Sequence, residues 1–246
     1  MKPQNYKIQG NFAWIITPNL CISQMNSKLT FSSIFAIISV TEIVAEMSNH
    51  ILLVYVTKPL IMVSILVYSA FAPNNRKAAG TPFFIVGTIF ALLGDCFLMI
   101  REKDLFIPGL ASFLVMQVLY AYAFYLDHKI EIFSKFSLTR TIPFLILALI
   151  LFVVLELKIP DFLLKTAVGI YAFSIATMAS MGFLRKEFVS AKSFHLVFQG
   201  ALLFMLSDSL IAVDRFLTPL ALNTLWVMGT YCIAQYLIVV GYLKTE

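Results

Sequence analysis

The chain is short of charged residues, of cysteine and of histidine, and each shortage excludes a class of protein. Only 13% of its 246 residues are Asp, Glu, Lys or Arg, while 60% are apolar; soluble chains carry about 25% charged residues. A soluble domain of this length could not bury so much apolar surface. The composition therefore excludes a soluble enzyme, a disordered protein and a nucleic-acid-binding protein. Three cysteines and three dispersed histidines offer neither a disulfide framework nor a zinc spacing, so we expect no metal and no cofactor.

The apolar residues fall into continuous runs, each near the length that crosses about 30 Å of hydrocarbon as an α-helix. The eight runs are 30–47, 51–71, 82–100, 106–126, 141–157, 162–184, 194–216 and 219–243. Continuous rather than alternating hydrophobicity excludes a transmembrane barrel, and no connecting segment is long enough to separate domains. The sequence predicts an all-α, polytopic membrane protein, with a single bundle of eight transmembrane helices over 30–246.

Residues 1–29 are mixed in character, and we expect them to form a non-essential N-terminal extension. Their apolar stretch 12–16 is too short to cross a bilayer, and translation from Met25 would omit most of the segment. Twelve of the eighteen Lys and Arg residues fall on the side that holds both termini and five on the other, while Lys58 falls within a helix. The positive-inside rule then predicts cytoplasmic termini, in the inner membrane if the source is bacterial.

A few ionisable side chains fall inside the predicted spans, where each costs about 2.5–3.5 kcal/mol and marks a functional site by default. Asp95 and Asp208 lie about fourteen residues into helices that run outward, and Lys58 lies eight residues into a helix that runs inward. The three should therefore reach one level of the bundle and face each other or a wet cavity. A Lys58–aspartate pair that only pins helix packing is the structural alternative, although one lysine cannot neutralise two aspartates.

Further polar residues in the spans are candidates for substrate binding or for support of the aspartates. Glu42 could belong to the site or to the interface, and Glu46, on the same helix face, is expected to be solvated. Gly94 beside Asp95, like the serine beside Asp208, would let another helix or a ligand approach closely. Tyrosine and glutamine in such spans also serve as hydrogen bonds between helices. The remaining candidates are Gln117, Tyr120, Tyr171, Ser207, Tyr231 and Gln235.

An ordered series of motifs over about 30–243 resembles a known family. The series comprises Thr57-Lys58-Pro59-Leu60, Leu93-Gly94-Asp95, "GLASFLVMQVLY" at 109–120, Tyr171, Met178, "GALLFMLSDSLIAVDRF" at 200–216 and "TYCIAQYLI" at 230–238. This order is similar to that of the YhhN-like lysoplasmalogenases, a family of integral membrane hydrolases. The resemblance implies hydrolysis of the vinyl ether bond of a lysophospholipid, a lysoplasmalogen, to a fatty aldehyde and a glycerophospho-choline or -ethanolamine. Family members commonly carry His where this chain has Gln117.

Two carboxyl groups suit this chemistry, because vinyl ether cleavage needs protonation of the β carbon and capture of an oxocarbenium ion by water. Glycoside hydrolysis divides similar tasks between one protonated and one ionised carboxyl group. We hypothesise that Asp208 is the acid and Asp95 the carboxylate that activates water, and the reverse assignment stays open. Lys58 would lie near the ionised partner or hold the substrate phosphate. Gln117 cannot transfer a proton as the family's histidine could, so either it only forms hydrogen bonds or the activity of this protein differs.

Three other functions compete with ether hydrolysis. An intramembrane aspartyl protease would need a GxGD motif, but Leu92 stands where the first glycine should be. A serine hydrolase would need a histidine near Ser207 or Ser209, and none of the three is placed for that. A proton-coupled transporter or lipid-binding membrane protein stays open, because buried Asp and Lys also mark transport. The helices, however, lack the paired Gly/Pro breaks of many transporters.

Overall fold

The computed structural model describes residues 13–71, 79–100, 103–128 and 135–243, and within these ranges it contains eight α-helices and no β-strand. The helices are α1 (Ala13–Met47), α2 (Ile51–Phe71), α3 (Thr81–Met99), α4 (Phe106–His128), α5 (Lys135–Glu156), α6 (Phe162–Leu184), α7 (Ala191–Phe216) and α8 (Asn223–Tyr242), with a 3-10 turn, η1 (Arg185–Glu187), after α6. All eight contain a segment long and apolar enough to cross a membrane. The predicted all-α fold with eight spans is confirmed, and the protein is a multi-pass integral membrane protein.

Seven of the helices form a closed ring, in which each packs against the next. The order around the ring is α1, α2, α3, α4, α6, α7 and α8, and α8 returns to α1. The remaining helix, α5, lies outside the ring and packs mainly on α6. Only 11% of its span is buried, against 61% of the α6 span. Because most of α5 has no protein neighbour, most of its surface is left to the lipid.

Aromatic side chains from different helices fill the centre of the ring. Phe84 of α3 stacks on Tyr120 of α4, with ring centroids 4.4 Å apart, and on Tyr242 of α8, at 4.2 Å. The outer surface is also apolar, and large side chains such as Leu52 and Phe162 are more than four-fifths exposed. In a membrane these side chains contact lipid tails instead of water, so exposing them carries no hydrophobic penalty.

Two glycines allow neighbouring helices to approach closely. A Cβ atom on Gly94 of α3 would lie 2.7 Å from the ring of Phe113 on α4, so only glycine fits the present packing. A Cβ atom on Gly200 of α7 would lie 2.8 Å from the carbonyl oxygen of Ala234 on α8. The close approach predicted beside Asp95 is therefore present, and it brings Phe113 against the residue that precedes this aspartate.

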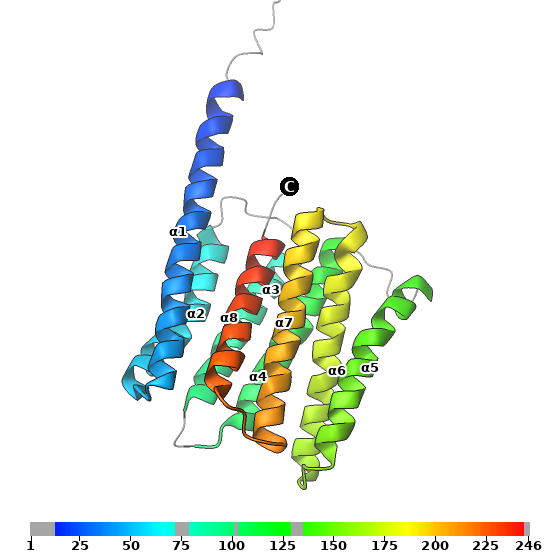
Figure 1. The fold of residues 1–246 in the computed structure, drawn as a ribbon. Coiled ribbons are helices and arrows are strands. Elements are labelled where there is room, and N and C mark those ends of the chain that lie inside the picture. The colour runs from blue at the N-terminus through cyan, green and yellow to red at the C-terminus, as the bar shows by residue number, and fades with distance from the viewer. Residues whose placement is uncertain (1–12, 72–78, 101–102, 129–134, 244–246) are drawn as a thin grey trace, which may run out of the picture.

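The start of α1 and the end of α8 lie at the same end of the bundle (Figure 1), as an even number of spans requires. The assignment of this end to the cytoplasm stays a prediction. We call the opposite end the distal end; it carries the connections 48–50, 157–161 and 217–222, and the described residues 100 and 103–105 between α3 and α4. Helix α1 begins within the expected extension 1–29, and its membrane-length apolar part starts at Ser27. Residues 1–12 lie outside the described residues.

Candidate active site

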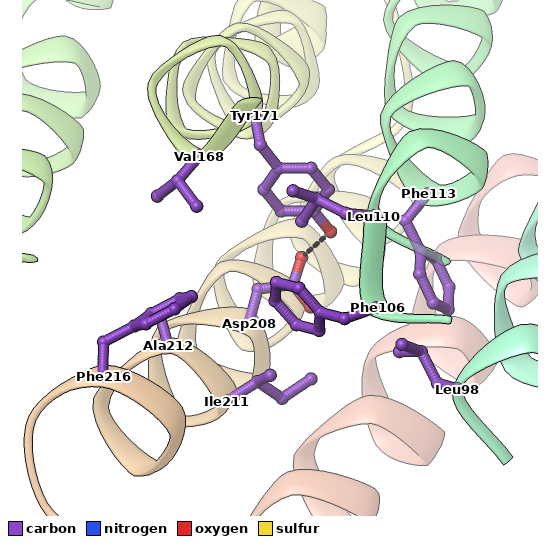
Figure 2. Close-up of a pocket in the computed structure, with 10 residues that line it drawn as sticks. All are labelled: Leu98, Phe106, Leu110, Phe113, Val168, Tyr171, Asp208, Ile211, Ala212 and Phe216. Atoms are coloured by element: carbon purple, nitrogen blue, oxygen red, sulfur yellow. Dashed lines mark hydrogen bonds between the residues drawn. The ribbon is translucent and has the colours of Figure 1, made fainter. Parts of the chain in front are cut away.

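Asp208 of α7 receives hydrogen bonds from two other helices. The hydroxyl group of Tyr171 on α6 donates to its Oδ2 atom (Figure 2). Gln117 of α4 donates to the same oxygen, with Nε2 3.3 Å away. Within the described part of the chain, the other oxygen, Oδ1, receives no hydrogen bond. The carboxyl group is therefore fixed through one oxygen, which leaves the second available to a ligand.

Asp208 and Tyr171 lie in the wall of an otherwise apolar cavity of about 50 Å³ (Figure 2). The apolar lining comes from α3, α4, α6 and α7 and consists of Leu98, Phe106, Leu110, Phe113, Val168, Ile211, Ala212 and Phe216. A second cavity of about 40 Å³ reaches the same aspartate from the side of α5. Because one water needs about 10–15 Å³, either space can hold water beside the carboxyl group.

Asp95 of α3 is buried, at 4% exposure, and it too is held by a tyrosine from another helix. The hydroxyl group of Tyr231 on α8 donates to its Oδ2 atom at 2.7 Å. Both aspartates therefore share one arrangement, in which a neutral tyrosine hydroxyl group binds one carboxyl oxygen. A tyrosine donor can stabilise a carboxylate without adding a charge to the membrane interior.

Phe113 of α4 lies between the surroundings of the two aspartates. Its ring contacts Gly94, next to Asp95, and packs edge-on against Tyr231 at 6.0 Å. The same ring lines the cavity that contains Asp208. In the sequence, Phe113 stands out only as one residue of the motif at 109–120. Phe113 therefore packs against neighbours of Asp95 and also forms part of the cavity wall beside Asp208.

Lys58 of α2 pairs with two glutamates of α1 rather than with either aspartate. Its Nζ atom lies 3.2 Å from Oε2 of Glu46 and 3.9 Å from Oε1 of Glu42. Glu42 is fully buried, and its other oxygen accepts a hydrogen bond from Thr57. The prediction that Glu46 is solvated is wrong, because its side chain is only 18% exposed and is ion-paired. We call Glu42, Glu46, Thr57 and Lys58 the charged cluster.

The remaining candidates are distributed over the interior of the bundle. Tyr120 shares a hydrogen bond with Thr88 at 2.9 Å, which joins α4 to α3. Ser207 donates to the carbonyl oxygen of Val227 at 3.0 Å and so joins α7 to α8. Gln235 is buried, and within the described residues its Nε2 atom has no hydrogen-bond partner. The structure thus gathers Gln117 and Tyr171 around Asp208, whereas Tyr120 and Ser207 connect helices.

Charged residues at the distal end line a polar pocket, and they are Lys103, Asp104 and Arg215. Arg215, at the end of α7, binds both carboxylate oxygens of Asp104, at 3.0 and 3.1 Å. Its guanidinium group lies 4.0 Å from the ring centroid of Phe106. The sequence contained one indication that Arg215 lies on the same side of its helix as Asp208, because Arg215 follows Asp208 by two helical turns. Among the described residues, no group of His, Cys, Asp and Glu is arranged to hold a metal ion.

Comparison with known proteins gives a family match and two named relatives. Residues 53–242 match the YhhN family. Proteins named lysoplasmalogenase TMEM86A from Bos taurus and Homo sapiens are 28% and 27% identical to this chain over 164 residues. Each match covers 65% of this chain and 65% of the relative, so the chain spans just under two thirds of those relatives. No solved structure is significantly similar to the chain. The family match includes Asp95 and Asp208.

Proposed function

The chain belongs to the YhhN family, and from that premise we propose that it hydrolyses the vinyl ether bond of lysoplasmalogens. The products would be a fatty aldehyde and a glycerophospho-base. One observation carries the proposal: the half-buried carboxyl group of Asp208 lies in the wall of an apolar cavity, with Oδ2 held by Tyr171 and Gln117 and Oδ1 without a partner among the described residues. An acid that protonates a carbon atom of a lipid needs this combination of a free oxygen and apolar surroundings.

A groove between α4 and α6 supports the proposal that the substrate is a lipid. It has a volume of about 580 Å³, and its lining is mostly apolar, with Leu114, Val118, Ile170 and Phe173 among its residues. Leu114 of the groove lies one helical turn beyond Leu110 of the Asp208 cavity, so the two spaces are neighbours along α4. Val118, Ile170 and Phe173 are about half exposed or more, which leaves the groove open to the bilayer. The alkenyl chain of the substrate would lie in this groove.

The proposed reaction begins with Asp208 as the acid. Its carboxyl group donates a proton to the β carbon of the vinyl ether, which places positive charge on the α carbon and the ether oxygen. Tyr171 and Gln117 stabilise the carboxylate that remains, because charged acceptors form the stronger hydrogen bonds. Water then adds to the α carbon and gives a proton to Asp95, as in the two-carboxyl scheme of glycoside hydrolysis.

Collapse of the hemiacetal completes the cycle. The hemiacetal hydroxyl group returns a proton to Asp208, and the bond between the α carbon and the glycerol oxygen breaks. The glycerol oxygen takes the proton from Asp95, so both carboxyl groups regain their starting states. Aldehyde and glycerophospho-base leave with no change in oxidation state, so this scheme requires no redox cofactor.

The test is aldehyde release from choline and ethanolamine lysoplasmalogens by purified protein in detergent. The wild type should release aldehyde, and Asp208→Asn and Asp95→Asn should each lose most of the rate. Asp214→Asn is the matched control: it lies on the same helix as Asp208, but it binds the amide of Leu220 and lines no part of the cavity. Near-normal rates in both site variants would refute the mechanism.

A proton-coupled transporter is the alternative function. The same purified protein can be used to distinguish transport from hydrolysis. The charged cluster lies on α1 and α2, away from the cavity, and could carry protons in such a protein. Proton-linked uptake of a lysolipid into vesicles, without aldehyde release, would favour transport over hydrolysis.

A further inference from the structure

We propose that Arg215 and Lys103 bind the phosphodiester group of the lipid substrate, in a polar pocket at the distal end of the bundle. The inference rests on the proposed function and extends it from the reacting bond to the head group. It assigns a specificity role to Arg215, whose position outside the cavity gives it no part in the chemical step.

The pocket is separate from the Asp208 cavity but shares a wall with it. Its volume is about 370 Å³, and its charged lining residues are Lys103, Asp104 and Arg215. Leu98 and Phe106 line both this pocket and the Asp208 cavity. A ligand that passes between these two side chains would therefore place a polar end among the cations and an apolar end beside Asp208.

The spacing along α7 fits a glycerophospholipid. Arg215 follows Asp208 by seven residues, so the two lie on nearly the same helix face and about 10.5 Å apart along the axis. In a lysoplasmalogen, the vinyl ether oxygen and the phosphate occupy the two ends of a three-carbon glycerol backbone. The backbone and the long arginine side chain together can cover this distance, so the vinyl ether can reach Asp208 while the phosphate meets Arg215.

Arg215 keeps donors available for a phosphate. Only its Nη2 atom bonds Asp104, so within the described part of the chain Nε and Nη1 have no partner. The guanidinium group lies over the ring of Phe106, a residue that lines both spaces. Among the described lining residues, Lys103 and Arg215 are positive and Asp104 is negative, so the lining carries one net positive charge. Arginine suits this role because its fixed donors match phosphate oxygens.

Lys58 is the other candidate for binding the phosphate, but glutamates of α1 already neutralise its charge. Glu42 and Glu46 both pair with it, so its immediate surroundings carry a net negative charge. A phosphate there would meet two carboxylates, whereas the distal pocket offers two cations and one carboxylate. The comparison of charges favours the distal pocket.

The experiment compares lysoplasmalogen with a 1-alkenylglycerol of the same chain, which lacks the phosphate. Arg215→Met should raise KM for lysoplasmalogen about tenfold, the size of one lost charge-assisted hydrogen bond, and leave KM for the alkenylglycerol unchanged. Arg215→Lys should recover part of the loss. Asp104→Asn should lower KM for lysoplasmalogen, because it removes the competing carboxylate but keeps an oxygen for the amide of Phe106.

Arg140→Met is the matched control, because Arg140 also pairs with an acid, Glu187, and lies near a phenylalanine ring, outside this pocket. It should change neither KM. Equal effects of Arg215→Met on both substrates would show a purely structural role and overturn the proposal, as would no effect on either. Equal losses from Asp104→Asn and Arg215→Met would also overturn it, because they would identify the ion pair itself as the requirement.

A binding measurement keeps this test independent of catalysis. Isothermal titration with a non-cleavable 1-alkyl lysophospholipid should show weaker binding to Arg215→Met, while binding of the matching 1-alkylglycerol should not change. If the wild type released no aldehyde, the proposed function would fail, and this titration would still decide whether the phosphate site exists. Inorganic phosphate that bound the wild type as tightly as the lipid would reassign the pocket to a free anion and overturn the proposal.

Discussion

Replacing Tyr171 with Phe tests the acid role of Asp208 most directly. The change removes a single hydroxyl group, which donates to Oδ2 of Asp208. The ring remains, so the wall of the cavity keeps its shape. Gln117 also remains, and its amide still donates to the same oxygen at 3.3 Å. The variant therefore alters the hydrogen bonding of one carboxyl group and little else.

The magnitude follows from the change of charge on Asp208 during the reaction. A hydrogen bond to a neutral acid contributes about 0.5–1.5 kcal/mol, and one to a carboxylate about 1.5–3 kcal/mol. If Asp208 gives up its proton in the transition state, loss of the Tyr171 donor raises the barrier by the difference, about 1–1.5 kcal/mol. That difference lowers kcat about tenfold. Gln117→Leu should cost less, because the amide contact is longer.

The assay is steady-state aldehyde release, coupled to an aldehyde-reducing enzyme and measured with lysoplasmalogen in mixed micelles. Tyr236→Phe is the matched control, since this tyrosine shares a hydrogen bond with Ser32 at 2.7 Å and lines no part of the Asp208 cavity. It should lose stability to a similar degree but keep kcat. Melting temperatures in detergent would show that both variants are folded.

One result would refute the assignment. If Asp208 were instead the base that accepts a proton, it would be charged before the reaction and neutral afterwards. Removing Tyr171 would then destabilise the starting state more than the transition state, and kcat would stay constant or rise. An unchanged or faster Tyr171→Phe variant would therefore exclude Asp208 as the acid and favour the reverse assignment to Asp95.

Two further predictions concern stability. Lys58→Met should lower the free energy of unfolding by about 3 kcal/mol or more, because it leaves the fully buried Glu42 without its cation, and Glu42→Gln in the same chain should restore part of it, as measured by thermal unfolding in detergent. Gly94→Ala should destabilise the protein by about 1–3 kcal/mol, because the new methyl group would lie 2.7 Å from Phe113, whereas Gly229→Ala, with no atom within 4 Å, should leave the melting temperature unchanged or raise it.

Hydropathy predicted the number and order of the helices because lipid imposes one length on every span. It placed their ends less well where a helix continues beyond the apolar run. The predicted span 141–157 corresponds to a helix that starts at Lys135, and the predicted span 30–47 to one that starts at Ala13. Polar residues such as Thr139 and Arg140 can be helical outside the hydrocarbon, so polarity there marks the membrane boundary and not the end of the helix. Hydropathy also could not predict that α5 lies outside the ring, because lipid-facing and buried surfaces are both apolar.

For the site, the sequence could give the depth of a residue in the membrane but not the direction in which it faces around the bundle. Counting residues along each span singled out Asp95 and Asp208 as deep acids. It could not show that Tyr231 binds Asp95 and that Tyr171 binds Asp208, because the depth of a residue does not give the direction of its side chain. Such contacts depend on the order of helices around the ring, in which α6 follows α4 and α5 is excluded.

The partner of Lys58 could have been predicted from the sequence, and the identity of this partner matters for the chemistry. Helices α1 and α2 are joined by a short turn, so residues equally far from that turn lie side by side, and Glu42 and Lys58 nearly satisfy this condition. A helical side chain leans toward the N-terminus of its helix. For Lys58 that direction leads to the turn, where Glu46 lies, and the lysine is therefore paired locally.

An aspartate beside a lysine would be held as a carboxylate and would be a poor acid. Because the charged cluster retains Lys58, Asp95 and Asp208 are left with neutral tyrosine donors, and each is able to hold or release a proton as the proposed ether hydrolysis requires.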